Sequence, residues 1–319
     1  MKVAVLGTGF GARHVELLAK RKEAESILVW GRKEEKLKEL KEKFHVQTTD
    51  DMEGVWRDGT IGLVDVCLPN HLHREAAIKA LRAGKHVFVE TPVAESLEDA
   101  EAILETAEQC GKRVFVDLFL RFEHPYEYLR QLVQGGKLGA LKELLIKRET
   151  PPWWGNLDST HIGMNLMVHD VDFVTGLLGE PEDVFACGMD VREQQSIATA
   201  RLKYDGCGAL VRGVSAMPQT YPFSVGYEAI LEQGTVRYHE DGYPDGTTDT
   251  RLELFCGDKK EEVPLRQVNC HEAAIVHVLQ CIKDDQASCL DIREAIRSLR
   301  TVLRMNQALA ESSPRDVDV

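Results

Sequence analysis

Three polar residues near the middle of the chain have types and spacing suited to proton transfer. Asn165, His169 and Asp172 fall at i, i+4 and i+7 of a helix predicted over residues 163–178, so they would form one stripe. A histidine there could exchange a proton with a hydroxyl or carbonyl oxygen near neutral pH. Apolar neighbours make parts of this helix core-like, so His169 could instead bond a backbone carbonyl as a structural histidine.

Several other side chains are candidates for substrate contact. Arg121 follows a predicted strand and could hold a carboxylate, a phosphate or a hydroxyl group. His161 is a second possible proton carrier, although a surface histidine would look the same. Trp153 and Trp154 could stack on the apolar face of a sugar ring, with core or interface packing as the alternative. Asp172 could contact the site residues without touching substrate, or serve only as a structural acid.

A glycine-rich loop lies between a predicted strand at 2–6 and a predicted helix at 13–22, which is typical of a dinucleotide cradle. Gly7 allows the tight turn, Gly9 leaves room for a pyrophosphate, and Ala12 allows close helix packing. The amides at the helix start would face the phosphates. The predicted cofactor-binding loop comprises Gly7, Thr8, Gly9, Phe10, Gly11 and Ala12.

The residues after the second predicted strand, at 26–30, indicate which cofactor is bound. An NAD enzyme would carry Asp or Glu there to bond the ribose, whereas this chain has Gly31 and Arg32. An arginine can hold a 2′-phosphate bidentately. The sequence therefore favours NADP(H), with NAD(H) possible. The alternative is that Arg32 belongs to the solvated face of the helix at 34–44.

The first 120 residues alternate strands and helices, which predicts an α/β fold with a doubly wound parallel sheet. Ligands bind such sheets at the carboxyl ends of the strands. The residues predicted to line the nicotinamide end of that cleft are Leu68, Pro69, Asn70, His73, Glu90 and Thr91.

After residue 138 the pattern changes to alternating polar and β-branched or aromatic residues, at 144–150 and 184–254. This predicts an α+β domain on an open, largely antiparallel sheet. We expect residues 1–120 to form an NAD(P)-binding Rossmann domain and residues 121–319 to form a domain for substrate binding and oligomerisation.

Composition narrows the class of protein. A net charge of −13 argues against nucleic acid and anionic membranes as partners. No apolar run approaches the roughly 20 residues of a membrane span, and the chain starts directly in a strand, so a cytoplasmic location is expected. The eight cysteines include no C-x-x-C pair and are expected to be free thiols, so no metal site is predicted.

Beyond the glycine loop, several segments carry a family resemblance. They are residues 69–73, 84–92, 121–125, 136–139 and 165–172. Together they resemble the glucose-fructose oxidoreductase and inositol dehydrogenase family, written Gfo/Idh/MocA. The resemblance implies a nicotinamide domain joined to an open-sheet domain, redox chemistry on sugars, inositols and related alcohols, and homodimers or homotetramers formed through the open sheet.

Two positions depart from the family pattern. The family usually has a lysine where this chain has Thr91, and an aspartate where it has Asn165. The resemblance implies that Thr91, Asn165 and His169 form the catalytic set. Losing one charge at a developing oxyanion can cost about 10² to 10³ in rate.

Three functions therefore stay open. The first is an NADP(H)- or NAD(H)-dependent oxidoreductase of a sugar, cyclitol or related compound, with His169 as acid-base. The second is an oxidoreductase of an imine or unsaturated carbonyl. The third is a cofactor-binding sensor or partner protein without hydride chemistry.

Overall fold

The structure is a computed structural model that describes residues 1–312, and the chain divides into two compact units. Unit 1 consists of Met1–Phe122 and Asn269–Ile296, and unit 2 consists of Glu123–Val268 and, among the described residues, 297–312. Residues 269–296 thus pack with the N-terminal unit, although the sequence placed them in a domain at 121–319. No helix among the described residues is both long and apolar enough to cross a membrane.

Unit 1 is built on a six-stranded parallel sheet in the order β3-β2-β1-β4-β5-β6, the strand order of the Rossmann fold. Its strands are β1 (Lys2–Leu6), β2 (Ser26–Trp30), β3 (Gln47–Thr49), β4 (Ile61–Val66), β5 (His86–Val89) and β6 (Val114–Val116). Its helices are α1 (Gly11–Leu18), α2 (Glu34–Phe44), α3 (Met52–Arg57), α4 (His73–Arg82), α5 (Leu97–Cys110) and α8 (Cys270–Lys283), with 3₁₀ turns at Asn70–Leu72 and Phe119–Phe122.

Local sequence explains these elements. The central strand β1 is apolar and almost fully buried, as expected for a parallel strand covered on both faces. Helix α5 begins where the Ser96 side chain accepts a hydrogen bond from the Asp99 amide. It ends at Gly111, whose φ of 60° continues the chain in the left-handed conformation that glycine adopts without strain.

Unit 2 is built on an eight-stranded sheet in the order β14-β13-β12-β11-β7-β10-β9-β8. Among the described strands, β7 and β10 pair in parallel and the other neighbours are antiparallel. The strands are β7 (Leu141–Glu149), β8 (Asp183–Arg192), β9 (Gln195–Tyr204), β10 (Cys207–Val214), β11 (Phe223–Leu231), β12 (Gly234–Gly242), β13 (Thr248–Cys256) and β14 (Lys259–Glu262).

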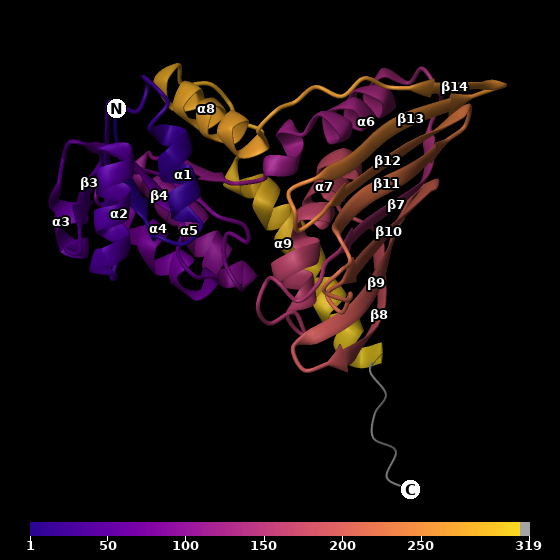
Figure 1. Cartoon of the computed structure of the whole chain (residues 1–319), viewed down its shortest axis with the longest axis horizontal. Coiled ribbons are helices and arrows are strands. Elements are labelled where there is room, and N and C mark those ends of the chain that lie inside the picture. The colour runs from indigo at the N-terminus through magenta and orange to yellow at the C-terminus, as the bar shows by residue number, and fades with distance from the viewer. Residues whose placement is uncertain (313–319) are drawn as a thin grey trace, which may run out of the picture. The chain divides into compact units, whose positions relative to one another are not determined.

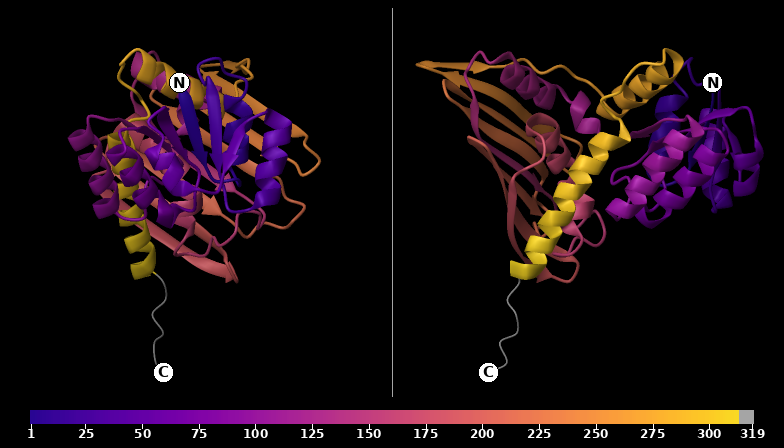
Figure 2. Two further views of the ribbon diagram at one scale, coloured as in Figure 1. Left: turned by 90° about the vertical axis from the view of Figure 1, so that its left-hand side faces the viewer. Right: turned by 180° about the vertical axis from the view of Figure 1, so that it is seen from behind.

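Helices cover one face of this sheet. Figures 1 and 2 show α6 (His124–Gly135), α7 (Val168–Leu178) and the later part of α9 (Ile292–Ser312) on the same side of it. On β7, Leu144 and Ile146 are buried beneath these helices, whereas Leu145 is 39% exposed on the opposite face. The predicted fold class, a parallel Rossmann sheet plus an open, largely antiparallel sheet, is confirmed.

Candidate functional site

The glycine loop has the geometry of a phosphate cradle. Gly7 has a φ of 113°, and a Cβ there would overlap the carbonyl oxygen of Cys67, so only glycine fits. A Cβ on Gly9 would meet nothing within 4 Å, so its backbone faces open space. No side chain caps the first turn of α1, and no acid lies in that turn. The amides of Ala12 and Arg13 donate to the Gly9 and Phe10 carbonyl oxygens, so the helix start offers an anion chiefly its positive dipole.

Gly11 also allows α1 to pack closely on the sheet, a role that the sequence assigns to Ala12. A Cβ on Gly11 would lie 3.2 Å from both Val5 Cγ1 and Cys67 Cβ, which is tighter than ordinary contact. Ala12 is only half-buried. The close approach fixes the first turn of α1 directly beyond the carboxyl end of β1.

The end of β2 presents a cation beside this loop. A Cβ on Gly31 would lie 2.6 Å from Thr8 Cγ2, so the absence of a side chain lets the two segments pack together. Arg32 is exposed and makes no hydrogen bond or ion pair within residues 1–312. Its guanidinium is thus available to a ligand, and no acid lies beside it at position 31 or 33.

The loop after β4 has an exposed surface and a buried support. Leu68, Pro69 and Asn70 are exposed or half-buried. His73 is fully buried, with Nδ1 2.8 Å from the Pro92 carbonyl oxygen and Nε2 2.7 Å from that of Leu68. Burial lowers the pKa of His73 below its ordinary value. His73 joins the loops after β4 and β5, so any effect it has on a cofactor would pass through them.

Two residues predicted to act on substrate bond to the protein itself in unit 1. The Thr91 hydroxyl donates to the Asp117 carbonyl oxygen at 2.9 Å, so it keeps lone pairs for accepting a hydrogen bond while its proton is used. Arg121 donates to the Cys289 carbonyl oxygen at 2.6 Å and lies 3.3 Å from Glu294 Oε2. Its side chain is 11% exposed and ties Phe119–Phe122 to the segment before α9.

In unit 2, the predicted stripe begins in a π-helical turn, Gly163–Met167, followed by α7. Such turns are rare and frequently lie at functional sites. Asn165 is exposed and His169 is half-buried. Asp172 is buried and its Oδ1 accepts a hydrogen bond from Ser298 Oγ at 3.1 Å. The structure therefore leaves Asn165 and His169 partly accessible and places Asp172 inside the unit.

Other polar and aromatic candidates of unit 2 lie on its surface. His161 is about half exposed and its Nδ1 is 2.7 Å from Asp158 Oδ1. Burial opposes ionisation of Asp158, but hydrogen bonds from His161 and its neighbours hold the pKa of that carboxyl below its usual range. Trp153 is 38% exposed and Trp154 57% exposed, so neither indole belongs to the core. Trp154 packs edge-on against Phe223 at 6.1 Å.

Comparison with known proteins identifies the first unit. Residues 1–118 match the family described as Gfo/Idh/MocA, an oxidoreductase family with an NAD-binding Rossmann fold. The match covers the part of the chain that forms the parallel sheet of unit 1. The family resemblance and the NAD(P)-binding Rossmann fold are thereby confirmed.

Curated relatives of this family align over parts of the chain. A myo-inositol 2-dehydrogenase of Thermotoga maritima is 29% identical over 194 residues, which are 59% of this chain and 58% of that protein. A D-glucoside 3-dehydrogenase of Escherichia coli is 26% identical over 279 residues, covering 81% of this chain and 75% of that one.

Solved structures share the whole fold. A UDP-N-acetylglucosamine 3-dehydrogenase of Acidithiobacillus ferrooxidans has a TM-score of 0.82 at 21% identity and covers 98% of both chains. A biliverdin reductase of Synechocystis, solved with biliverdin and NADP+, has a TM-score of 0.82 at 19% identity over 97% of this chain and 99% of that one. At these identities the likeness concerns the fold alone.

Unit 1 also contains a buried cluster that was not predicted from the sequence. His14 of α1 is 1% exposed, and its Nδ1 lies 2.8 Å from Asp65 Oδ2 on β4. Burial alone would lower the pKa of His14, but the carboxylate of Asp65 raises it well above the ordinary value. Glu90 Oε1 lies 3.0 Å from His14 Nε2, and burial raises the pKa of Glu90. A charged residue inside the apolar strand at 61–66 was the available signal for this cluster.

Proposed function

We propose that the protein is an oxidoreductase that prefers NADP(H) and acts on a hydroxyl or carbonyl carbon of a sugar, cyclitol or related compound. The observation that carries this proposal is the pairing of an uncapped glycine cradle with an exposed, unpaired arginine at the end of β2. The names of the inositol and glucoside dehydrogenases support the substrate class.

Each part of the cofactor has a matching group in unit 1. The open face at Gly9 and the positive end of the α1 dipole suit the pyrophosphate. Arg32, helped by the exposed Lys33, suits the 2′-phosphate of NADP(H). When bound, the nicotinamide supplies the hydride donor or acceptor, and the chain has to supply the proton.

We assign proton transfer to His169. Its imidazole is half-buried at the start of α7, one helical turn after the exposed amide of Asn165. An imidazole changes charge near neutral pH, so it can take a proton from a substrate hydroxyl during oxidation and return one during reduction. Asn165 would orient the ring by a neutral hydrogen bond where a carboxylate is usual. His161, paired with Asp158, is the second proton carrier to test.

The Thr91 hydroxyl favours a second candidate function. Its proton is used on the Asp117 carbonyl, so Thr91 supplies neither charge nor a free donor to an oxygen that becomes negative. Reduction of an imine or unsaturated carbonyl places less demand on such a group. This second candidate keeps the same cofactor and changes the substrate class.

Turnover assays separate these candidates. Purified protein is incubated with NADP+ or NADPH and a panel of sugars, inositols, ketones and imines, and nicotinamide absorbance is followed. Oxidation of a polyol supports the first candidate, and reduction confined to imines or unsaturated carbonyls supports the second. Binding of NADPH without turnover of any compound would make the protein a cofactor-binding sensor, and failure to bind either nicotinamide cofactor would overturn the proposal.

We also propose that copies of the chain associate through the uncovered face of the eight-stranded sheet. Leu145 on that face is 39% exposed. On the edge strand β8, Phe185 is 56% exposed and lies in register with Leu145 across β10 and β9. Apolar side chains on an uncovered sheet face are typical of association between copies. A homodimer or homotetramer would bury them.

A further inference from the structure

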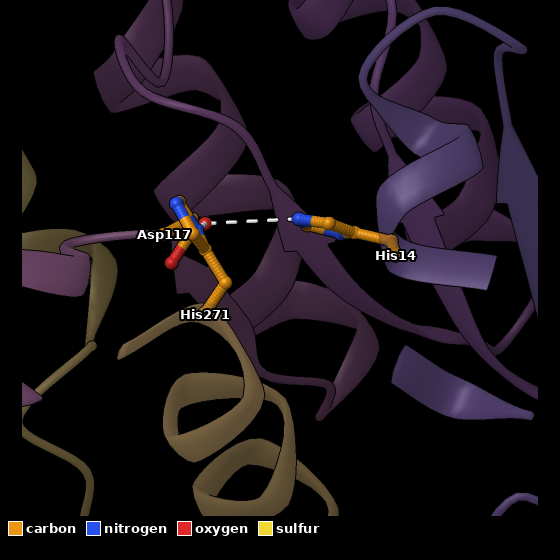
Figure 3. Close-up of side chains that lie close together, drawn as sticks. All are labelled: His14, Asp117 and His271. Carbon is orange, nitrogen blue, oxygen red and sulfur yellow. Dashed lines mark hydrogen bonds and ion pairs between the residues drawn. The ribbon is translucent and has the colours of Figure 1, made fainter. Parts of the chain in front are cut away.

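A group of side chains capable of binding a metal lies at the carboxyl edge of the unit 1 sheet. His14 comes from α1, Asp117 from the residue directly after β6, and His271 from the second residue of α8. Their ligand atoms all lie within 4.8 Å of one another. Figure 3 shows the ring of His14 pointing toward Asp117, with His271 reaching the same carboxylate from α8.

The separations suit one small cation. His14 Nε2 lies 3.7 Å from Asp117 Oδ2, and His271 Nδ1 lies 2.8 Å from the same oxygen. Ligand atoms around a tetrahedral zinc ion with bonds of roughly 2.0–2.1 Å are about 3.3 Å apart. These two distances bracket that value, and the ligand nitrogens of His14 and His271 lie within 4.8 Å of each other.

Two polar atoms of the group lack a hydrogen bond. His14 Nε2 and Asp117 Oδ1 are buried, and neither makes a hydrogen bond within the described residues. Glu90 Oε1 lies 3.0 Å from this nitrogen, outside hydrogen-bond geometry. Buried polar atoms without a hydrogen bond are uncommon in native proteins, and a bound ion is one explanation.

The surroundings of His14 match those of a metal-bound histidine. Its Nδ1 is bonded to the buried carboxylate of Asp65 at 2.8 Å. A carboxylate on one ring nitrogen directs the lone pair of the other nitrogen toward the metal and makes it more basic. Aromatic rings enclose the group: Phe119 lies 4.5 Å from the His271 ring and Phe10 lies 5.2 Å from it. Phe10 is 47% exposed, so the group lies close to solvent on that side.

We propose that His14, Asp117 and His271 bind a divalent transition-metal ion, with water completing the coordination. Two imidazoles and one carboxylate suit Zn²⁺, whereas Mg²⁺ and Ca²⁺ prefer all-oxygen sites. The ion would join α1, the end of β6 and α8, which are more than 100 residues apart in sequence. It would therefore stabilise unit 1 whether or not the protein turns over a substrate.

The alternative to a metal ion is a second proton on the His14 ring. With a proton on Nε2, His14 would be an imidazolium among Asp65, Glu90 and Asp117, and no ion would be needed. The two alternatives differ in the role of His271, because a metal requires its Nδ1 as a ligand and an imidazolium at His14 does not.

The test uses full-length protein freed of metal with a chelator and titrated with Zn²⁺ by calorimetry. Binding of one ion per chain is expected, together with tetrahedral visible absorption when Co²⁺ replaces Zn²⁺. His271→Gln is expected to weaken Zn²⁺ binding by at least about 100-fold, and Asp65→Asn by about 10- to 100-fold through its effect on His14. His45→Asn, which removes an exposed imidazole elsewhere in unit 1, is the matched control and should bind as the parent does.

Stability provides an independent measure. Zn²⁺ should raise the melting temperature of the parent protein and of His45→Asn, but not that of His271→Gln, because an ion that binds the native state stabilises it by mass action. His271 is partly exposed, so its variant should fold even if His14 variants do not.

Two results would overturn the proposal. One is the absence of saturable Zn²⁺ or Co²⁺ binding, which would leave the imidazolium as the occupant. The other is equal affinity in the parent and His271→Gln with loss in Cys281→Ser. That pattern would place the ion at His277, whose Nε2 lies 3.4 Å from the Cys281 thiol.

Discussion

Arg32→Ala is the sharpest test of the cofactor assignment. Arg32 is exposed and has no partner within the described residues, so its removal breaks no internal ion pair and leaves no buried charge. A charge-assisted hydrogen bond to a phosphate is worth about 1.5–3 kcal/mol, and solvent screening at an exposed position lowers the expected range to about 1–2 kcal/mol. The affinity for NADPH should therefore fall about 5- to 30-fold, while that for NADH changes little.

Dissociation constants for both cofactors, measured by quenching of tryptophan fluorescence or by calorimetry, decide the outcome. Arg82→Ala removes another exposed arginine of unit 1, at the end of α4, and should leave both constants unchanged. Added salt should weaken NADPH binding in the parent more than in Arg32→Ala, because exposed charges are screened. Equal affinity of the parent for NADPH and NADH, or an equal loss for both in Arg32→Ala, would refute the assignment.

Three further predictions concern catalysis, assembly and acid stability. His169→Ala should lower the turnover number about 10²- to 10⁴-fold in steady-state assays. Thr91→Lys with Asn165→Asp should raise turnover of a polyol. If the parent enzyme is fast and His169→Ala does not slow it, this histidine is not the proton carrier. Light scattering at micromolar concentration should report a dimer or larger, and Leu145→Glu should favour the monomer; a monomeric parent would contradict association through the sheet. Burial, with help from nearby cations, lowers the pKa of His86 to about 4, so the folded state disfavours its charged form, and stability should fall as the pH drops from about 6.5 toward 4. His86→Gln should remove about 1 kcal/mol of that acid sensitivity in urea unfolding, after discounting for partial exposure, and parallel pH profiles of the two proteins would contradict this account.

The cofactor cradle could be predicted from sequence because its signal is local. The turn at Gly7 and the helix after it are adjacent in the chain, and the absence of an acid after β2 is visible at one position. The parallel strands were also predictable, because buried parallel strands are short apolar runs between helices. The role of Gly11 was not predicted: the sequence assigns the close packing of α1 to Ala12, whereas a Cβ on Gly11 would also lie only 3.2 Å from Val5 Cγ1 of β1.

The other features of the fold and of the candidate site depend on contacts between residues that are distant in sequence. A heptad-like spacing cannot reveal that residues 163–167 form a π-helical turn, or that Asp172 bonds to Ser298 of α9. The amphipathic pattern of α8 indicates a buried face but not which unit covers it. The position of residues 269–296 in the chain therefore led to their prediction in the C-terminal domain, whereas they pack with unit 1. No metal site was predicted because cysteine spacing was the signal considered, whereas the proposed ligands are histidines and a carboxylate from positions 14, 117 and 271.

Asp117 links the two regions of unit 1 on which the proposals rest. Its carbonyl oxygen accepts the Thr91 hydroxyl and so holds the loop after β5, whereas its carboxylate faces His14 and His271. Its amide donates to the Val89 carbonyl oxygen, which fixes both roles to the end of β5. Because the backbone serves the first role and the side chain the second, a change confined to the carboxylate disturbs the cluster without removing the support of Thr91. The metal proposal and the redox proposal therefore depend on different atoms of the same residue, and either can fail without the other.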